Sequence, residues 1–451
     1  MTVLERVREQ EGKTGVADSE YAAAVAAQSD ELPRTLKHEL VSRLGLATVA
    51  SMVSTPDLEQ ARAELRVTCQ AILNEERFSE LLPQEREQLT SRVLDEVVGL
   101  GPIQPLLDDN TVSEVMVNGC GALYFERDGR LLRSKVRFES ADQIMMVVDR
   151  ILAPLGRRLD KSSPLVNARL TNGDRVNAVA VPIAIDGPYL TIRKFSNRIT
   201  SMDQLVSYGS LPAWYATLLK WAVQLRRDIA VAGGTGSGKT TLLNALSTQI
   251  DHGERVITIE DSAELRFAPE AHVVRMEARD ASIEGTGEVT IRDLVKNALR
   301  QRPDRIVVGE VRGAEAIDML QAMNTGHDGS LTTLHAGTAE EAILRLVLMA
   351  RFGMDLPASI IEEQIATALD LIVMSARRGD GSRRITSLSQ VSRDERGGVR
   401  LEEVVSYDQA DDCWHLSVEP AFVTLAVASG ALSEEEVSQW RSSTLRAACA
   451  A

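Results

Sequence analysis

Long apolar runs are missing from this sequence of 451 residues. No apolar stretch reaches the roughly 18 residues that are needed to cross a bilayer. The longest candidate, over residues 421–432, is interrupted by Thr424, Ser429 and Gly430. The first ten residues lack the apolar core of a signal peptide. We therefore expect a cytoplasmic protein whose contact with a membrane is peripheral.

Cysteines are also few, and the chain has no excess of positive charge. The four cysteines are scattered without a Cys-x-x-Cys spacing, which argues against disulfides and a zinc site and fits a reducing compartment. The formal net charge is −15, whereas a protein that tracks nucleic acid usually carries a basic face. We therefore expect no stable nucleic-acid binding, with a local basic patch as the open alternative.

The N-terminal half divides into three segments. Residues 1–34 are rich in Ala, Glu, Gln and Ser without an apolar period, which is typical of a disordered tail. Apolar residues then recur at helical spacing and predict a helical bundle over 35–100, which we interpret as a packing or oligomerisation module. Residues 101–195 read as an α+β domain. Its expected strands are 112–118, 122–126 and 189–193, with a helix over 143–155.

The C-terminal half has a different pattern. After a polar linker over 196–210, short apolar strands alternate with helical stretches over 211–400. This alternation predicts an α/β domain with a mostly parallel sheet covered on both faces. The remaining segment, 401–451, is an acidic C-terminal extension in which residues 432–437 resemble the capped start of a helix.

A glycine-rich loop matches the full Walker A pattern G-x-x-x-x-G-K-[ST], between an apolar strand and a helical run. Glycines let backbone N–H groups point at an anion, and the helix N-terminus adds a favourable dipole. Lys239 is expected to reach the β- and γ-phosphates, and the Thr240 hydroxyl to bind Mg²⁺. The predicted ATP-binding residues are Gly233, Gly234, Thr235, Gly236, Ser237, Gly238, Lys239, Thr240 and Thr241.

Two acidic elements follow. Most P-loop enzymes end a later strand with an Mg²⁺-binding aspartate, but here Gly309 takes that place and Glu310 comes next. Glu310 is therefore the candidate to orient or deprotonate the attacking water, and the alternative is a plain ion pair with Arg312. Glu260 ends an earlier strand and is expected to hold Mg²⁺ or the water. For its neighbour Asp261, the alternative is a structural role as the cap of the next turn.

Two of the six histidines flank one short apolar strand. His327 precedes this strand and His335 ends it. An imidazole can hydrogen-bond the γ-phosphate or its water. Metal binding is not favoured, because no third Cys or His lies nearby in the sequence. The alternative for each is a packed core histidine.

Four elements therefore follow one another along the chain: the glycine-rich loop, the strand that ends at Glu260, the strand before Glu310 and the strand between the histidines. They resemble, in that order, the Walker A motif, acidic box, Walker B motif and histidine box of the ATPases of type II and type IV secretion and type IV pilus systems. The glycine before Glu310 matches the Walker B motif of this family. The stretches at 156–160, 299–313 and 318–330 are most similar to the tight-adherence (Flp) pilus branch. The resemblance covers about residues 90–395. It implies an Mg²⁺-dependent ATPase motor that powers assembly of such a pilus or a related secretion machine.

The resemblance also implies an architecture. The subunits form a homo-hexamer, each with an α+β (PAS-like) N-terminal domain and a RecA-like motor domain, with ATP between them. Arginines of the N-terminal domain reach the phosphates, and Arg169, Arg175 and Arg193 match them here. From the residues alone these three are equally ordinary surface arginines. The ring docks on the cytoplasmic face of the inner membrane through platform proteins.

Three residues depart from the family pattern. Asn167 stands where aspartate is common, Gln301 where methionine is usual, and Gly337 replaces the asparagine of the histidine box. None of the three removes a phosphate-binding or acidic group, so hydrolysis is still expected at an undetermined rate. Two alternatives remain open: a conjugation-type ATPase that exports DNA or effector proteins, and a scaffold ring that binds ATP without cycling.

Overall fold

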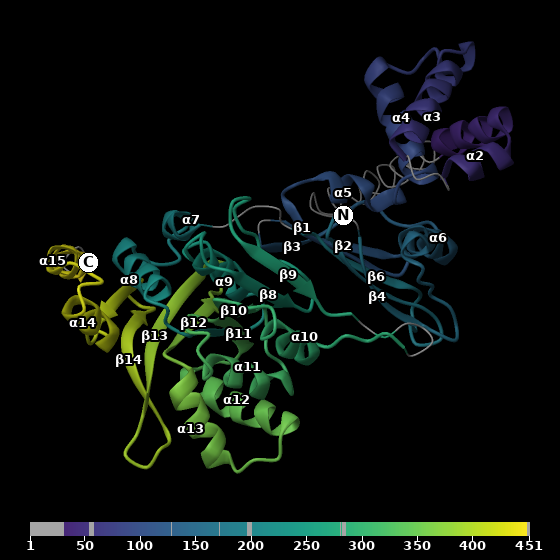
Figure 1. Ribbon diagram of the computed structural model, residues 1–451. Helices are drawn as coiled ribbons and strands as arrows, with labels where there is room; N and C mark the ends of the chain where they lie inside the picture. The colour runs from purple at the N-terminus through teal and green to yellow at the C-terminus, as the bar shows by residue number, and fades with distance from the viewer. Residues whose placement is uncertain are drawn as a thin grey trace, which may run out of the picture. The chain divides into compact units, whose positions relative to one another are not determined.

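The chain forms two compact units, Met1–Phe195 and Ser196–Ala451, in the computed structural model (Figure 1). The structure describes residues 31–53, 58–127, 129–170, 172–195, 201–279, 281 and 286–448. Most of the predicted tail, residues 1–30, therefore lies outside the described residues. A helix over residues 31–44 begins inside the segment that the sequence assigned to this tail.

Helices open the first unit, over the segment with helical periodicity. They are the helix over 31–44, α2 (Leu46–Val53), α3 (Leu58–Leu73), η1 (Glu76–Phe78) and α4 (Pro83–Val97). Leu65, Cys69 and Ile72 recur at intervals of three and four along α3, and all three are buried against Val93 and Leu94 of α4. Pro83 begins α4 at a position where a missing N–H does no harm.

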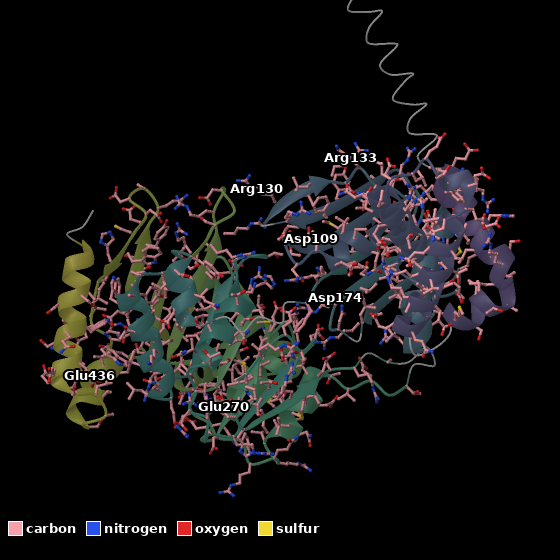
Figure 2. All side chains as sticks on the ribbon, turned by 90° about the horizontal axis from the view of Figure 1, so that it is seen from above. Asp109, Arg130, Arg133, Asp174, Glu270 and Glu436 are labelled. Carbon is pink, nitrogen blue, oxygen red and sulfur yellow. The ribbon has the colours of Figure 1, made fainter. Side chains whose placement is uncertain are left out.

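An antiparallel sheet forms the rest of the first unit, in the order β3-β2-β1-β6-β5-β4. Its strands are β1 (Val112–Asn118), β2 (Ala122–Arg127), β3 (Arg130–Arg133), β4 (Leu165–Arg169), β5 (Arg175–Val179) and β6 (Tyr189–Arg193). Its helices are η2 (Gly101–Ile103), α5 (Gln104–Asp108), α6 (Ala141–Leu152) and η3 (Ala153–Leu155). The edge strand β3 is exposed along its length, with Arg130 and Arg133 reaching outward (Figure 2).

The second unit contains a nine-stranded sheet in the order β15-β14-β13-β12-β7-β11-β10-β8-β9. The strands are β7 (Ile229–Gly233), β8 (Val256–Glu260), β9 (Val273–Glu277), β10 (Arg305–Val308), β11 (Leu331–His335), β12 (Leu371–Arg377), β13 (Arg383–Arg393), β14 (Val399–Asp408) and β15 (Cys413–Leu416). The six strands from β12 to β9 are parallel, and β13, β14 and β15 extend the sheet as antiparallel strands. This mostly parallel sheet between helices is the expected α/β, RecA-like fold.

Helices cover both faces of this sheet (Figure 1). They are α7 (Met202–Ser207), α8 (Ala213–Gln224), α9 (Lys239–Ser247), α10 (Ile291–Ala298), α11 (Glu315–Met323), α12 (Ala339–Gly353), α13 (Ala358–Ala368), α14 (Ala421–Ala428) and α15 (Glu434–Ala448). In β7, Ile229 and Val231 join a core with α8 and α9, while Ala230 and Ala232 join a second core with α10 to α13. The strand is apolar throughout because both of its faces are buried.

The boundaries of the second unit differ from those expected. The helix α7 lies within the predicted linker, and its Met202 and Leu205 are buried in the core beside α8. The strand β14 runs across residue 400, so the acidic extension continues the sheet. Its last helix, α15, packs on α8, where the indole of Trp440 donates to the Trp214 oxygen at 2.8 Å. The extension is therefore part of the α/β domain of the second unit.

Candidate nucleotide-binding site

The glycine-rich loop connects β7 to α9, and its backbone requires glycine. Gly236 and Gly238 have φ values of 71° and 98°, in the left-handed region that side chains rarely adopt. At Gly233, a Cβ atom would lie 2.2 Å from the backbone oxygen of Ser375 in β12. The helix α9 begins directly at Lys239. The loop and the helix N-terminus therefore have the geometry of an anion site.

Lys239 lies at this loop with its ammonium group nearly buried. The residue is 8% exposed, and Nζ donates to the backbone oxygens of Gly234 at 3.0 Å and Gly233 at 3.2 Å. Nζ also lies 3.3 Å from Nδ1 of His335, at the end of β11. A desolvated ammonium needs such acceptors. Phosphate oxygens are stronger acceptors than these neutral groups because they carry charge.

Glu310 is held between a cation and an imidazole. Its Oε2 accepts a hydrogen bond from Nη2 of Arg312 at 2.6 Å, and Nη1 of Arg312 lies 3.4 Å from Asp261. Nε2 of His335 approaches Oε1 of Glu310 to 2.9 Å, but without the alignment of a hydrogen bond, so this buried oxygen has no hydrogen-bond partner. Glu310 is thus fixed through one oxygen and can accept through the other.

His335 bridges Lys239 and Glu310. Burial and the nearby Lys239 charge lower the pKa of its imidazole, while Glu310 opposes this effect. We infer that the imidazole is neutral at pH 7. Because ammonium can only donate, Nδ1 must be the acceptor, which assigns the proton to Nε2 on the side of Glu310. Lys239, His335 and Glu310 therefore form one continuous polar chain.

Glu260 is buried beside Gly309. It is 2% exposed, and its Oε2 accepts the backbone N–H groups of Glu264 at 2.6 Å and Leu265 at 3.0 Å. Burial raises the pKa of the carboxyl, and these two bonds partly offset the effect. A Cβ atom at position 309 would lie 3.0 Å from Cγ of Glu260. The glycine before Glu310 therefore provides the space that Glu260 occupies.

The donors expected for Mg²⁺ fit that ion. Oε1 of Glu260 is buried without a hydrogen-bond partner, and Thr240 lies half-buried in the first turn of α9, beside Thr241. Mg²⁺ prefers hard oxygen ligands and usually keeps water and substrate phosphates in its shell. Within the described ranges, no cluster of three or more His, Cys, Asp or Glu side chains could hold a metal ion. Phosphate oxygens would therefore have to complete its coordination.

His327 does not join these residues. It lies four residues before β11, at the edge where the parallel strands begin, whereas Lys239, Glu310 and His335 lie where strands end. Its Nδ1 is 3.1 Å from the backbone oxygen of Ala322. His327 therefore belongs to the turn between α11 and β11.

The three arginines of the first unit form a row. Arg169 of β4 is directly opposite Arg175 of β5, and Arg175 is directly opposite Arg193 of β6. Residues that pair in this way point to the same face of a sheet. The guanidinium of Arg169 also lies 5.6 Å from the ring centre of Phe195. The same row continues to Glu114 of β1, which is directly opposite Arg193 and interacts with its charge. Guanidinium groups suit phosphate recognition, so Arg169 and Arg175 leave part of this face able to bind an anion.

The sequence reasoning missed the hairpin of β12 and β13 beside the loop. The hydroxyl of Ser375 donates to the backbone oxygen of Ser237 at 2.7 Å, and Nε of Arg383 donates to that of Gly236 at 3.1 Å. A local signal does exist: two Arg-Arg pairs, at 377–378 and 383–384, flank a turn. These arginines lie more than a hundred residues after the loop in the sequence, so the sequence pattern did not indicate that they contact it.

Comparison with known proteins identifies the family. Residues 96–404 match the family described as type II/IV secretion system protein. The chain belongs to this family. A Mycobacterium tuberculosis protein named for conjugal transfer is 37% identical over 332 residues, which cover 72% of this chain and 91% of the relative. The type IV secretion system protein PtlH of Bordetella pertussis is 34% identical over 311 residues, 63% of this chain and 91% of the relative.

A solved structure is also similar to this chain. The VirB11 ATPase from the Brucella suis type IV secretion system shares 30% identity, covering 66% of this chain and 96% of that chain, with a TM-score of 0.36. Among the residues that the structure describes, no helix combines the length and the apolarity of a membrane span.

Proposed function

We propose that this member of the type II/IV secretion family is an Mg²⁺-dependent ATP hydrolase. The observation that carries the proposal is the polar chain from Lys239 through His335 to Glu310 at the mouth of the glycine-rich loop. A phosphate-binding lysine and a carboxylate with one unpartnered oxygen are two of the groups that P-loop enzymes use to hydrolyse a γ-phosphate. Lys239, as the phosphate ligand, and Glu310, as the base, are thus linked through contacts with His335.

Each residue has a distinct part in this reaction. Lys239 exchanges the backbone oxygens of Gly233 and Gly234 for the β- and γ-phosphates. The open oxygen of Glu310 orients the attacking water and accepts its proton, while Arg312 fixes the other oxygen. When the Lys239 ammonium group moves to the phosphates, Nδ1 of His335 loses this donor and can accept a hydrogen bond from the attacking water. Thr240 and Glu260 would hold Mg²⁺, which would supply positive charge beside the phosphates.

The proposal extends to assembly. The chain works as a homo-hexameric ring in which the arginine row of Arg169, Arg175 and Arg193 provides a second set of phosphate ligands. Opening and closing of the two units during the ATP cycle drives inner-membrane platform proteins at the cytoplasmic face. The machine is a Flp-type pilus or a related type II/IV secretion system. The family membership and the row of opposite arginines support this assignment.

A conjugation-type export ATPase is the second candidate. The similarity to a protein named for conjugal transfer and to PtlH of type IV secretion favours it. The net charge of −15 favours the pilus machine instead. Titration of the purified chain with single-stranded DNA at several salt concentrations distinguishes the two. Salt-dependent binding at low micromolar protein supports the export reading.

Steady-state hydrolysis of Mg-ATP by the full chain tests the enzymatic proposal. Glu310→Gln should lower kcat by at least roughly 10²-fold, since it removes the base and keeps the shape. Lys239→Ala should abolish turnover, and Glu340→Gln, in an exposed acid of α12, should leave it unchanged. Near-normal turnover by Glu310→Gln would show that Glu310 is not the base. A wild-type rate no higher than that of Lys239→Ala would indicate a non-cycling scaffold.

A further inference from the structure

Two arginines face each other across the β12–β13 hairpin. Arg377, the last residue of β12, is directly opposite Arg383, the first residue of β13. Both side chains are exposed and, as a directly opposite pair, point to the same face of the sheet. Like charges directly opposite each other destabilise a strand pair, and an anion near both of them offsets this repulsion.

This pair lies over the phosphate-binding loop. Nη1 of Arg377 is 3.5 Å from the position that a Cβ atom of Gly236 would take, and Cδ of Arg383 is 3.1 Å from that of Gly238. Nε of Arg383 donates to the Gly236 oxygen at 3.1 Å. A side chain at either glycine would therefore contact an arginine, so the loop and the pair fit each other.

The two neighbouring arginines, Arg378 and Arg384, have a different partner. Nη1 of Arg378 and Nε of Arg384 lie 3.1 and 3.0 Å from Oδ1 of Asp412. The hydrogen bonds from Arg384 and Tyr407 lower the pKa of that carboxyl to about 2. Arg378 and Arg384 are therefore held by Asp412, while Arg377 and Arg383 both lie beside Gly236 of the loop.

The order of strands indicates which end of the nucleotide the pair would meet. The loop follows β7, which lies between β12 on one side and β11 on the other. His335 ends β11 and Glu310 follows β10, so the γ-phosphate belongs on that side of the loop. Arg377 and Arg383 lie on the opposite side, where the α-phosphate and the nucleoside leave the loop.

We propose that Arg377 and Arg383 bind the α-phosphate end of the nucleotide. This inference rests on the proposed function, because it requires the loop to bind ATP. Bidentate guanidinium groups suit a phosphate oxygen pair. ATP and ADP share the α-phosphate, so the two arginines contribute equally to the affinity for both. They act on nucleotide binding and release, and leave the cleavage step to Glu310.

Calorimetric titration of the full chain with ADP and with a non-hydrolysable ATP analogue, both with Mg²⁺, tests the proposal. Arg377→Gln and Arg383→Gln should each raise Kd for both ligands by roughly tenfold, the size of a lost hydrogen bond to a charged group. The ratio of the two Kd values should stay constant, and kcat at saturating ATP should change less than about twofold. Arg384→Gln is the matched control and should bind like the wild type.

Three results would overturn the inference while the wild type still binds nucleotide. They are unchanged Kd values in both variants, an equal loss in Arg384→Gln, and a loss confined to the ATP analogue, which would place the pair at the γ-phosphate. A wild type that binds neither ligand would overturn the proposed function as well. If Arg383→Gln unfolds the hairpin, Arg383→Lys and Arg377→Gln provide the same comparison.

Discussion

Asp370 accepts the backbone N–H of Asp228 at 2.8 Å, which brings two acidic side chains together where β7 and β12 begin. Asp228 is only 6% exposed, and its Oδ1 accepts the backbone N–H of Ser330 at 2.8 Å. Burial and the neighbouring Asp370 raise the pKa of Asp228 to about 8. The folded chain therefore keeps a proton on this carboxyl at neutral pH, at the opposite edge of the sheet from the P-loop.

Asp228→Asn should flatten the pH dependence of stability. The folded pKa of about 8 exceeds the ordinary value of 3.8, so the folded state binds more protons between these values. The free energy of unfolding of the wild type therefore falls as pH rises from about 4 to about 8. Urea unfolding at pH 5, 7 and 9 should show the variant gaining on the wild type with rising pH. Asp355→Asn, at an exposed acid, is the control. Parallel curves would contradict the buried proton.

The lowered pKa of His335 predicts a second pH dependence of stability and activity, below pH 6.5. Its pKa in the folded state is lowered below 6.5, so the unfolded state binds more protons just below that pH. Its contribution to stability is present above pH 6.5 and is lost as pH falls toward the folded pKa. Protonation also removes the Nδ1 acceptor that the proposed reaction uses for the water. ATPase activity should therefore fall below pH 6.5, and unfolding of His335→Asn should lack this pH dependence. An acid limb of unfolding that is identical in both proteins would exclude His335.

Gly309→Ala should destabilise the second unit. The added methyl group would lie 3.0 Å from Cγ of Glu260, whose side chain is held by two backbone N–H groups. Overpacking of this kind costs about 1–3 kcal/mol. Gly234→Ala is the control, because nothing lies within 4 Å of its Cβ position. Equal unfolding free energies of the two variants in urea would show that Glu260 yields without strain.

Arg305 should be among the residues least tolerant of replacement. It is fully buried, and its Nε and Nη2 donate to Glu254 at 2.7 and 2.8 Å while Nη1 donates to the Val223 oxygen at 2.7 Å. Arg305→Met would leave Glu254 without this bidentate partner and should lower the free energy of unfolding by about 3–5 kcal/mol. Exposed Arg300→Met should lower it by less than about 1 kcal/mol. A loss for Arg305→Met as small as that of an exposed ion pair would refute this.

The sequence alone predicts that several residues of the candidate site lie together, because each is marked by a short stretch of residues around it. The glycine-rich loop, Glu260, Glu310 and His335 each lie at or just after the end of an apolar strand, and parallel strands bring such ends to one edge. The role of Gly309 as space for Glu260 required the structure, because it depends on how two strands are spaced. His327 stood out only by rarity, and strand direction places it at the other edge.

Elements formed by long-range pairing were less predictable. The strands β3, β4 and β5 are short and partly exposed, so they lack a clear apolar alternation. The packing of Ser375 on Ser237 joins residues 138 positions apart, and only the pairing of β12 with β7 creates it. For the same reason, α7 and the acidic extension read as peripheral although their apolar residues complete the core around α8.

The bond from Trp440 to Trp214 joins the last helix of the second unit to one of its first. The first described helix of the unit, α7, also packs on α8, so the first and last described helices lie beside the same element. Such a unit can be opened elsewhere without changing the order of its strands. The exposed turn between β13 and β14, at 394–398, offers a new pair of ends far along the chain from the loop. A short linker between the old ends would then produce a circularly permuted motor domain.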